Sequence, residues 1–167
     1  MDLTSASHST SRLPGLDDSE HACWEFFLES STRLGEIVYQ RLLDEHELTL
    51  VDLLLLDALT KSDGGSARMG DLAERLTLTP SRVTARIRRL QTRRLVERRA
   101  AKDDRRSVLA SITHDGRACL RRAMDTYART VRELYLDRLS RRRMTALGDS
   151  CRRINDDLPA RRWFDSV

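Results

Sequence analysis

Hydrophobic residues recur every three or four positions through most of the chain, which is the spacing of a helix that buries one face. The ranges with this spacing are 18–45, 49–61, 68–76, 80–93 and most of the chain after residue 113. Residues 95–100 and 107–112 read as strands, because in the second of them Val108, Ala110 and Ile112 occupy alternate positions. The pattern therefore predicts a mainly helical (mainly α) protein with one small β-hairpin.

Two of the predicted helices are joined by a tight turn. The helical pattern breaks between Thr77 and Pro80. Thr79 is a natural N-cap, and Pro80 then falls on the first helical position, where proline is best tolerated. A short helix, a tight turn and a second helix form a helix-turn-helix, and a hairpin directly after them makes the winged form.

The helices after the hairpin carry long apolar faces. Tyr127 and Tyr135 lie on the first of these faces. A second face steps by three and four residues like a coiled-coil seam, through Met144, Leu147, Cys151, Ile154 and Leu158. One small lobe cannot cover this much apolar surface, so a helical homodimer is expected. The alternative is burial against the first helix of the same chain.

Composition excludes several classes of protein. The 40% of hydrophobic residues suffices for a core. The longest apolar run, Leu53–Leu56, is too short to span a bilayer, and the N-terminus has no signal-peptide pattern. The 3 cysteines are widely spaced and odd in number, which argues against a disulfide framework or a zinc knuckle. We therefore expect a cytoplasmic protein with no membrane partner, metal or cofactor.

The distribution of charge points to a polyanionic partner. The formal net charge is only +4, but residues 82–106 hold ten Arg and one Lys against three acids, a net charge of +8. Many of these arginines fall on the polar face of the helix over residues 80–93. That face holds Ser81, Arg82, Thr84, Arg86, Arg88 and Arg89.

Such a face suits the major groove of double-stranded DNA. The groove accepts one helix, arginine binds guanine in bidentate fashion, and serine or threonine bonds to phosphates or base edges. Arginines at the hairpin tip suit a narrow minor groove. The plainer alternative is a solvated face in an arginine-rich protein.

From about Leu48 to Gly116 the chain resembles transcriptional regulators of the MarR family. The resemblance is carried by Met69-Gly-Asp-Leu-Ala-Glu-Arg-Leu76, Ser81-Arg-Val-Thr84, Leu90, Leu95-Val-Glu-Arg98, Asp104-Arg-Arg-Ser107 and Ile112-Thr-His-Asp-Gly116. Each piece is weak alone, but the string in this order and spacing is specific.

The resemblance implies an obligate homodimer on a pseudo-palindromic, inverted-repeat operator, acting as a repressor that a small ligand releases. The expected segments are a flexible tail (1–18), an N-terminal dimerisation helix (19–47), the winged domain (48–113) and C-terminal dimerisation helices (114–167). By position, the residues expected in the major groove are Ser81, Arg82, Thr84 and Arg86. In the hairpin, Asp104 would order the wing, Arg105 would contact phosphate and Arg106 would reach the minor groove.

One position departs from the family pattern. The family usually has glycine before the Leu-Val-Glu-Arg strand, where a helix ends in a left-handed turn, but this chain has Arg94. A non-glycine residue in that conformation costs about 1 kcal/mol.

The resemblance also implies a small aromatic or anionic ligand near the junction of the dimerisation and DNA-binding parts. The candidate pocket residues are Trp24, Phe27, Tyr39, His46 and Arg68, each of which has an alternative as core or surface. Cys23 is a candidate oxidant sensor, because it lies near the start of the first helix. No Lys or Arg lies within nine residues of it in the sequence, which weakens that interpretation.

An enzyme has little support in the sequence. The chain has no HExxH, GxSxG, P-loop or GxGxxG pattern, and its 4 histidines are not at metal-ligand spacings. No catalytic residue is therefore assigned. A third class, a basic architectural protein that binds any DNA, shares the charge pattern but would bind without sequence preference.

Overall fold

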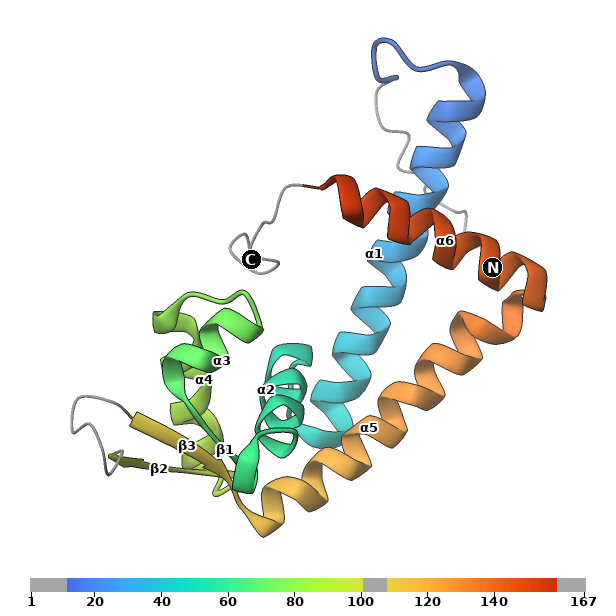
Figure 1. The fold of residues 1–167 in the computed structure, drawn as a ribbon. Helices are drawn as coiled ribbons and strands as arrows, with labels where there is room; N and C mark the ends of the chain where they lie inside the picture. The colour runs from blue at the N-terminus through green and yellow to red at the C-terminus, as the bar shows by residue number, and fades with distance from the viewer. Residues whose placement is uncertain (1–11, 101–107, 159–167) are drawn as a thin grey trace. The chain divides into compact units, whose positions relative to one another are not determined.

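The computed structural model describes residues 12–100 and 108–158, in two compact units that meet between Ile37 and Val38. Its helices and strands are labelled in Figure 1. In chain order they are α1 (Asp18–His46), α2 (Leu50–Thr60), η1 (Asp63–Gly65), β1 (Ser66–Arg68), α3 (Met69–Arg75), α4 (Pro80–Thr92), β2 (Val96–Ala100), β3 (Val108–Ile112), α5 (His114–Leu134), η2 (Leu136–Arg138) and α6 (Arg141–Asp157). The expected fold class, mainly α with a winged helix-turn-helix, is confirmed.

The first unit contains the N-terminal part of α1. The side chain of Asp17 accepts hydrogen bonds from the backbone N–H groups of Ser19 and Glu20, and Glu20 accepts one from the N–H of Asp17. This reciprocal pair satisfies amide groups that have no partner within the helix. The helix therefore begins where the sequence predicted.

The second unit contains a three-stranded antiparallel sheet in the order β1-β3-β2. Strand β1 was not predicted, and the sequence analysis wrongly assigned Arg68 to the following helix. A three-residue strand has no periodicity to detect. It forms because Ser66 to Arg68 pair with β3, where the Ser66 and Ser111 hydroxyls lie 2.7 Å apart.

The core of the second unit is centred on α2, which contacts α3, α5 and the sheet (Figure 1). Each fully buried leucine contributes about 1.5–3 kcal/mol. Those of α2 are Leu53, Leu55, Leu56 and Leu59. Helix α4 adds the apolar stripe that the sequence predicted, Val83, Ile87 and Leu90, all of them fully buried.

Helix α4 ends in a left-handed residue, although Arg94 stands here in place of the family's usual glycine. Arg94 has a φ of 58°. The N–H of Arg94 donates to the carbonyl of Gln91 at 2.9 Å, and the N–H of Leu95 donates to the carbonyl of Leu90 at 3.0 Å. These two bonds define a Schellman motif, which usually has glycine at the left-handed position. Helix α3 ends in the same way at Thr77, with a φ of 54°.

The start of α5 is attached to the end of α4. The hydroxyl of Thr113 accepts the N–H of Gly116 at 2.9 Å and donates to the carbonyl of Arg94 at 2.8 Å. A Cβ atom at Gly116 would overlap the carbonyl oxygen of Leu95. Glycine is therefore required here by close approach of the backbone.

Polar side chains join the last turns of α1 to α5. Arg41 donates to Glu133 at 2.9 Å, and the hydroxyl of Thr126 donates to Glu45 at 2.7 Å. Nε2 of His46 lies 2.9 Å from the same Thr126 oxygen. Since the Thr126 proton is used on Glu45, Nε2 of His46 is the donor in this pair.

This environment shifts the pKa values of two of these side chains. Burial lowers the pKa of His46, and nearby Arg122 and Arg129 act in the same direction, against the opposing charge of Glu45. The hydrogen bond from Thr126 lowers the pKa of Glu45. The folded protein thus favours a neutral imidazole beside an ionised carboxylate.

Among the helices of the described residues, none combines the length and apolar composition needed to cross a bilayer.

Replacing Arg94 with glycine should stabilise the protein. Glycine adopts a positive φ without steric cost, so the free energy of unfolding should rise by about 1 kcal/mol. Urea unfolding of wild type, Arg94→Gly and Arg94→Ala measures this. Alanine retains the strained Cβ, so Arg94→Ala should gain little, and an equal gain from both substitutions would refute the backbone explanation.

Stability should depend on pH through His46. Its pKa is lower folded than unfolded, so its contribution is complete above the ordinary value of 6.5 and is lost as the pH falls through the folded value. The drop in Tm between pH 7.5 and 5.5 should therefore be smaller in His46→Gln than in wild type. His114→Gln is the control, because His114 is exposed. If the Tm of His46→Gln falls between pH 7.5 and 5.5 by as much as that of wild type, this assignment is contradicted.

Candidate nucleic-acid interface

Helix α4 presents two different polar faces. Opposite its buried stripe lies an outer face on which Ser81, Ala85, Arg88 and Thr92 are exposed, with half-buried Thr84 beside them. Residues three, four and seven positions apart share one face of a helix. Arg88 is the one arginine of α4 on this outer face.

The other arginines of α4, together with Arg93 directly after it, form a stripe along its flank, with the spacing i, i+4, i+7 and i+11. They are Arg82, Arg86, Arg89 and Arg93. Nη1 of Arg86 lies 3.7 Å from Oδ2 of Asp52, and Nη1 of Arg89 lies 3.6 Å from the same oxygen. This flank therefore faces the first turn of α2.

The Asp52 carboxylate is held rigidly. Its side chain is 0% exposed. Oδ2 accepts hydrogen bonds from the backbone N–H and the hydroxyl of Thr49, at 2.9 and 2.8 Å, and the Thr49 hydroxyl in turn accepts the N–H of Asp52. This capping box starts α2. Oδ1 has no hydrogen-bond partner among the described residues.

The same arginine stripe also closes the end of α1. The carbonyl of Glu47 accepts hydrogen bonds from Arg89 at 3.0 Å and Arg93 at 2.7 Å. The carbonyl of His46 accepts a second bond from Arg93, at 2.8 Å. Cations at the C-terminal end of a helix satisfy carbonyls that have no partner within it and interact well with its dipole.

The structure separates the DNA-contact residues that the sequence grouped together. Ser81, Thr84 and Arg88 lie on or beside the outer face, whereas Arg82 and Arg86 lie on the flank. The start of the helix is as predicted, since the Thr79 hydroxyl accepts the N–H of Arg82. The wing residues Asp104, Arg105 and Arg106 lie outside the described residues.

The five candidate pocket residues are divided between the two units. Trp24 and Phe27, both exposed, have ring centroids 5.9 Å apart in the first unit. In the second unit Tyr39 is exposed on α1, His46 bonds to α5, and Arg68 lies on β1. No described contact joins these last three.

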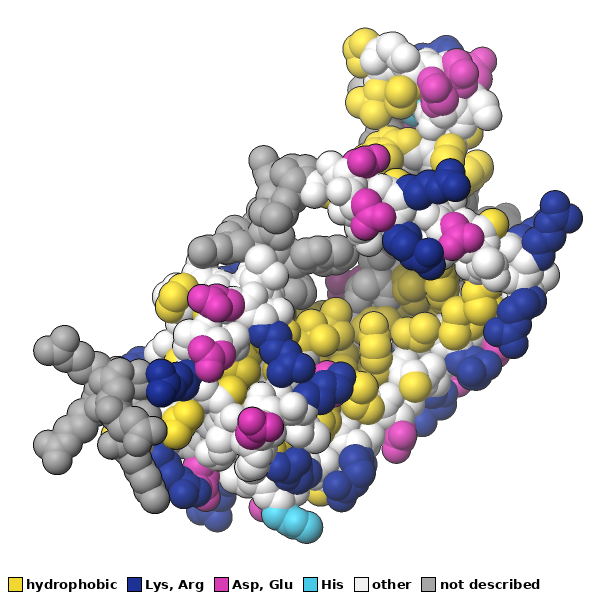
Figure 2. Space-filling view, viewed as in Figure 1, with side chains coloured by type: hydrophobic (Ala, Val, Ile, Leu, Met, Phe, Trp, Pro, Cys, Tyr) yellow, Lys and Arg dark blue, Asp and Glu magenta, His cyan; other side chains and the backbone are white. Residues whose placement is uncertain are grey.

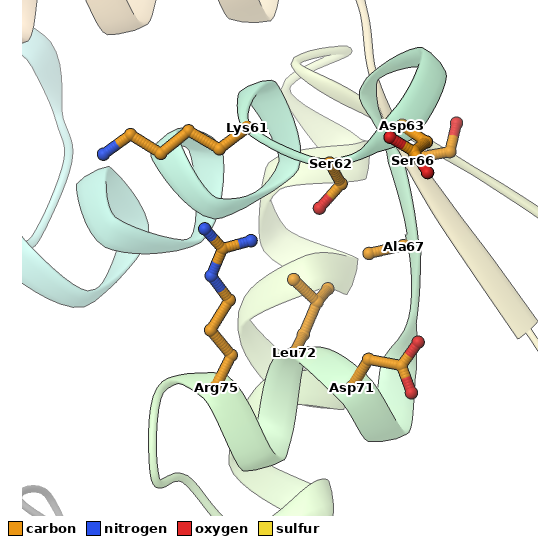
Figure 3. Close-up of a pocket in the computed structure, with 8 residues that line it drawn as sticks. All are labelled: Lys61, Ser62, Asp63, Ser66, Ala67, Asp71, Leu72 and Arg75. Carbon is orange, nitrogen blue, oxygen red and sulfur yellow. The ribbon is translucent and has the colours of Figure 1, made fainter.

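A separate cleft of about 370 Å³ lies between the end of α2, β1 and α3 (Figure 3). Its lining residues are Lys61, Ser62, Asp63, Ser66, Ala67, Asp71, Leu72 and Arg75. None of the five candidate pocket residues is among them. Figure 3 shows the basic Lys61 and Arg75 on one side of the cleft and the acidic Asp63 and Asp71 on the other, so the lining as a whole does not favour one charge of ligand.

The remaining chemistry-bearing residues are dispersed. Cys23 is exposed, Cys119 is buried and Cys151 is half-buried, all as free thiols. Within the described ranges, no group of three or more His, Cys, Asp or Glu side chains could hold a metal ion.

The contacts of Asp52 and the structural role of Arg89 and Arg93 were not predicted from the sequence. Thr49 was identified as an N-cap, and the spacing from Thr49 to Asp52 is that of a capping box. That spacing was the available signal for Asp52. The periodicity of the arginines was the available signal for the flank.

Comparison with known proteins identifies relatives of this chain. The sequence model of the MarR family matches residues 46–107. The organic hydroperoxide resistance transcriptional regulator of Bacillus subtilis (strain 168) is 30% identical over 100 residues, which cover 60% of this chain and 67% of that protein. These relatives are transcriptional regulators rather than enzymes, in line with the sequence prediction.

Two solved structures of similar fold come from Streptomyces coelicolor. AbsC, a MarR family transcriptional regulator, superposes with a TM-score of 0.76 at 29% identity, covering 87% of this chain and 97% of that one. Sco3205, a MarR family transcriptional regulator solved in complex with DNA, gives a TM-score of 0.77 at 27% identity, covering 87% and 95%. The chain belongs to the MarR family of transcriptional regulators.

Proposed function

We propose that this protein is a sequence-specific, DNA-binding repressor that acts in the cytoplasm as a homodimer on an inverted-repeat operator. The observation that carries the proposal is the outer face of α4, which is exposed, contains Arg88 and bears no acidic residue. The N-terminus of α4 lies beside this face, and backbone N–H groups there attract phosphate. The similarity to Sco3205, which was solved in complex with DNA, supports the same conclusion.

On this proposal the outer face of α4 enters the major groove. Arg88 donates to the O6 and N7 acceptors of a guanine, and the hydroxyls of Ser81 and Thr84 bond to base edges or phosphates. Arg82 on the flank reaches the phosphate backbone. Arg86 lies beside Asp52, so its contribution to DNA binding depends on that carboxylate.

For the wing, we retain the roles that the resemblance implies. Asp104 orders the hairpin, Arg105 contacts phosphate and Arg106 enters the minor groove. A narrow minor groove has an enhanced negative potential that attracts guanidinium groups.

Exposed apolar side chains support the homodimer. Figure 2 shows hydrophobic side chains along α5, beside a row of basic side chains at its outer edge. In the second unit Met124, Ile154 and Leu158 are exposed, and in the first unit Trp24, Phe26, Phe27 and Leu28 are exposed. A two-fold dimer that covers such surfaces places two recognition helices about 34 Å apart, one turn of DNA.

We further propose that a small aromatic or anionic ligand releases the repressor by favouring a different spacing of the two recognition helices. The alternative signal is oxidation of Cys23. It is supported by the exposure of this thiol and by the similarity to an organic hydroperoxide resistance regulator.

Selection of bound duplexes from random DNA tests the proposed function. The full-length protein should enrich an inverted repeat and bind it about 10³-fold or more tightly than a shuffled duplex in fluorescence anisotropy. Arg88→Ala should weaken binding to the selected duplex by about 1–3 kcal/mol. The control is Arg121→Ala, which removes an exposed arginine of α5 and should leave binding unchanged.

Two results would contradict the proposal. The first is failure to enrich any sequence, with equal affinities that fall steeply with salt, which would indicate an architectural DNA-binding protein. The second is a loss of affinity in Arg121→Ala as large as in Arg88→Ala.

A further inference from the structure

We propose that Asp52 is a positioning residue that withholds Arg86 and Arg89 from DNA phosphates and thereby increases the preference for the operator over other DNA. This inference rests on the proposed function. It concerns a residue of α2 that belongs to the core rather than to the outer face of α4.

The first support is the electrostatic need of the buried carboxylate. Asp52 is fully buried, and its two hydrogen-bond donors, both on Thr49, converge on Oδ2. Oδ1 has no such partner among the described residues. A buried charge is costly unless opposite charge lies close by, and Arg86 and Arg89 supply that charge.

The second support is that the two arginines remain within reach of a ligand. The Arg86 side chain is 35% exposed and that of Arg89 is 41% exposed. Their nitrogens lie 3.7 and 3.6 Å from the carboxylate oxygen, which is longer than an ordinary charged hydrogen bond. A phosphate at this flank would therefore compete with Asp52 for the same two guanidinium groups.

The third support is that Asp52 is already ordered. The capping box with Thr49 fixes the carboxylate before DNA arrives, so the pairing requires no further ordering of the acid. Arg89 is also held by its bond to the Glu47 carbonyl. Arg88 on the outer face has no carboxylate neighbour on its own helix, since α4 contains no acidic residue.

Withholding these two charges affects non-specific DNA most. Phosphate contacts carry no sequence information directly, and each one strengthens binding through counterion release. On the operator, base contacts fix the orientation of α4, so extra flank charges find few new phosphates. On DNA without the operator sequence, no base contact fixes the orientation of the protein, so it can bind in whichever orientation makes the most phosphate contacts. Releasing Arg86 and Arg89 should therefore strengthen non-specific binding more than operator binding.

A purely structural role for Asp52 predicts something else. As the third residue of a capping box it supports α2, and losing that support would lower stability and reduce all DNA affinities together. Asp52→Asn separates the two roles. Asparagine keeps a carbonyl oxygen for the Thr49 donors but removes the negative charge.

The experiment is a fluorescence anisotropy titration of full-length variants against the selected duplex and its shuffled version, between 50 and 200 mM salt. For Asp52→Asn, the slope of log K against log salt on shuffled DNA should steepen by up to about 1.8, which corresponds to two added phosphate contacts. The ratio of operator to shuffled affinity should fall roughly tenfold, since two freed charges favour the sequence-blind mode.

A matched pair on α4 keeps the test decisive if Asp52→Asn does not fold. On shuffled DNA, where no guanine is in register and Arg88 contacts phosphate instead, Arg88→Gln should reduce the slope by about 0.9. Arg86→Gln removes a charge already paired with Asp52 and should change that slope by much less. The proposal is overturned if folded Asp52→Asn keeps the wild-type slope and ratio, or if Arg86→Gln and Arg88→Gln lower the slope equally. A wild-type protein with no preference for the selected duplex would instead overturn the proposed function.

Discussion

The ion pairs between the buried carboxylate of Asp52 and the partly exposed arginines on the flank of α4 are the interaction on which the arrangement of the DNA-binding part depends. Helix α4 is strongly basic, and burial of Val83, Ile87 and Leu90 attaches it to the core along one face only. Asp52 gives the flank a fixed anchor on α2, at 3.6 and 3.7 Å from two of its guanidinium groups. Because one flank is anchored, the rotation of α4 about its own axis relative to α2 is defined, and so is the direction in which its outer face points.

The same helix is held at its other contacts by backbone groups. Arg89 and Arg93 bond to the carbonyls that end α1, and Thr113 bonds to the carbonyl of Arg94 where α4 ends. His46 connects α5 to the end of α4, because its ring bonds to Thr126 of α5 and its carbonyl accepts a hydrogen bond from Arg93. A change at the junction of α1 and α5 therefore has a direct structural route to α4.

Much of this fold was predictable from the sequence, because it depends on local periodicity. The stripe of Val83, Ile87 and Leu90 and the cap at Thr79 follow from spacing and residue type. The left-handed turn at Arg94 was indicated only by the family resemblance, because arginine itself disfavours that conformation. Strand β1 was missed, because three residues show no pattern until β3 lies beside them. The five candidate pocket residues came from the family resemblance, and they stay a prediction.

The candidate DNA interface was only half predictable. The helix and its positive charge were predicted from the sequence, but a count of arginines does not say which of them face outward. Arg86 and Arg88 differ by two positions and point in different directions, because one turn of helix takes 3.6 residues. What distinguishes them energetically is Asp52, more than thirty residues away in the chain, and that pairing arises only on folding.

A double-mutant cycle on the free energy of unfolding tests the central claim most directly. Wild type, Asp52→Asn, Arg86→Gln and the double variant are unfolded in urea, and the coupling energy is obtained from the four values. If the ion pair anchors α4, the two substitutions should be coupled by about 1 kcal/mol or more. Effects that add to within about 0.3 kcal/mol would show that the two side chains do not interact, and would contradict the account.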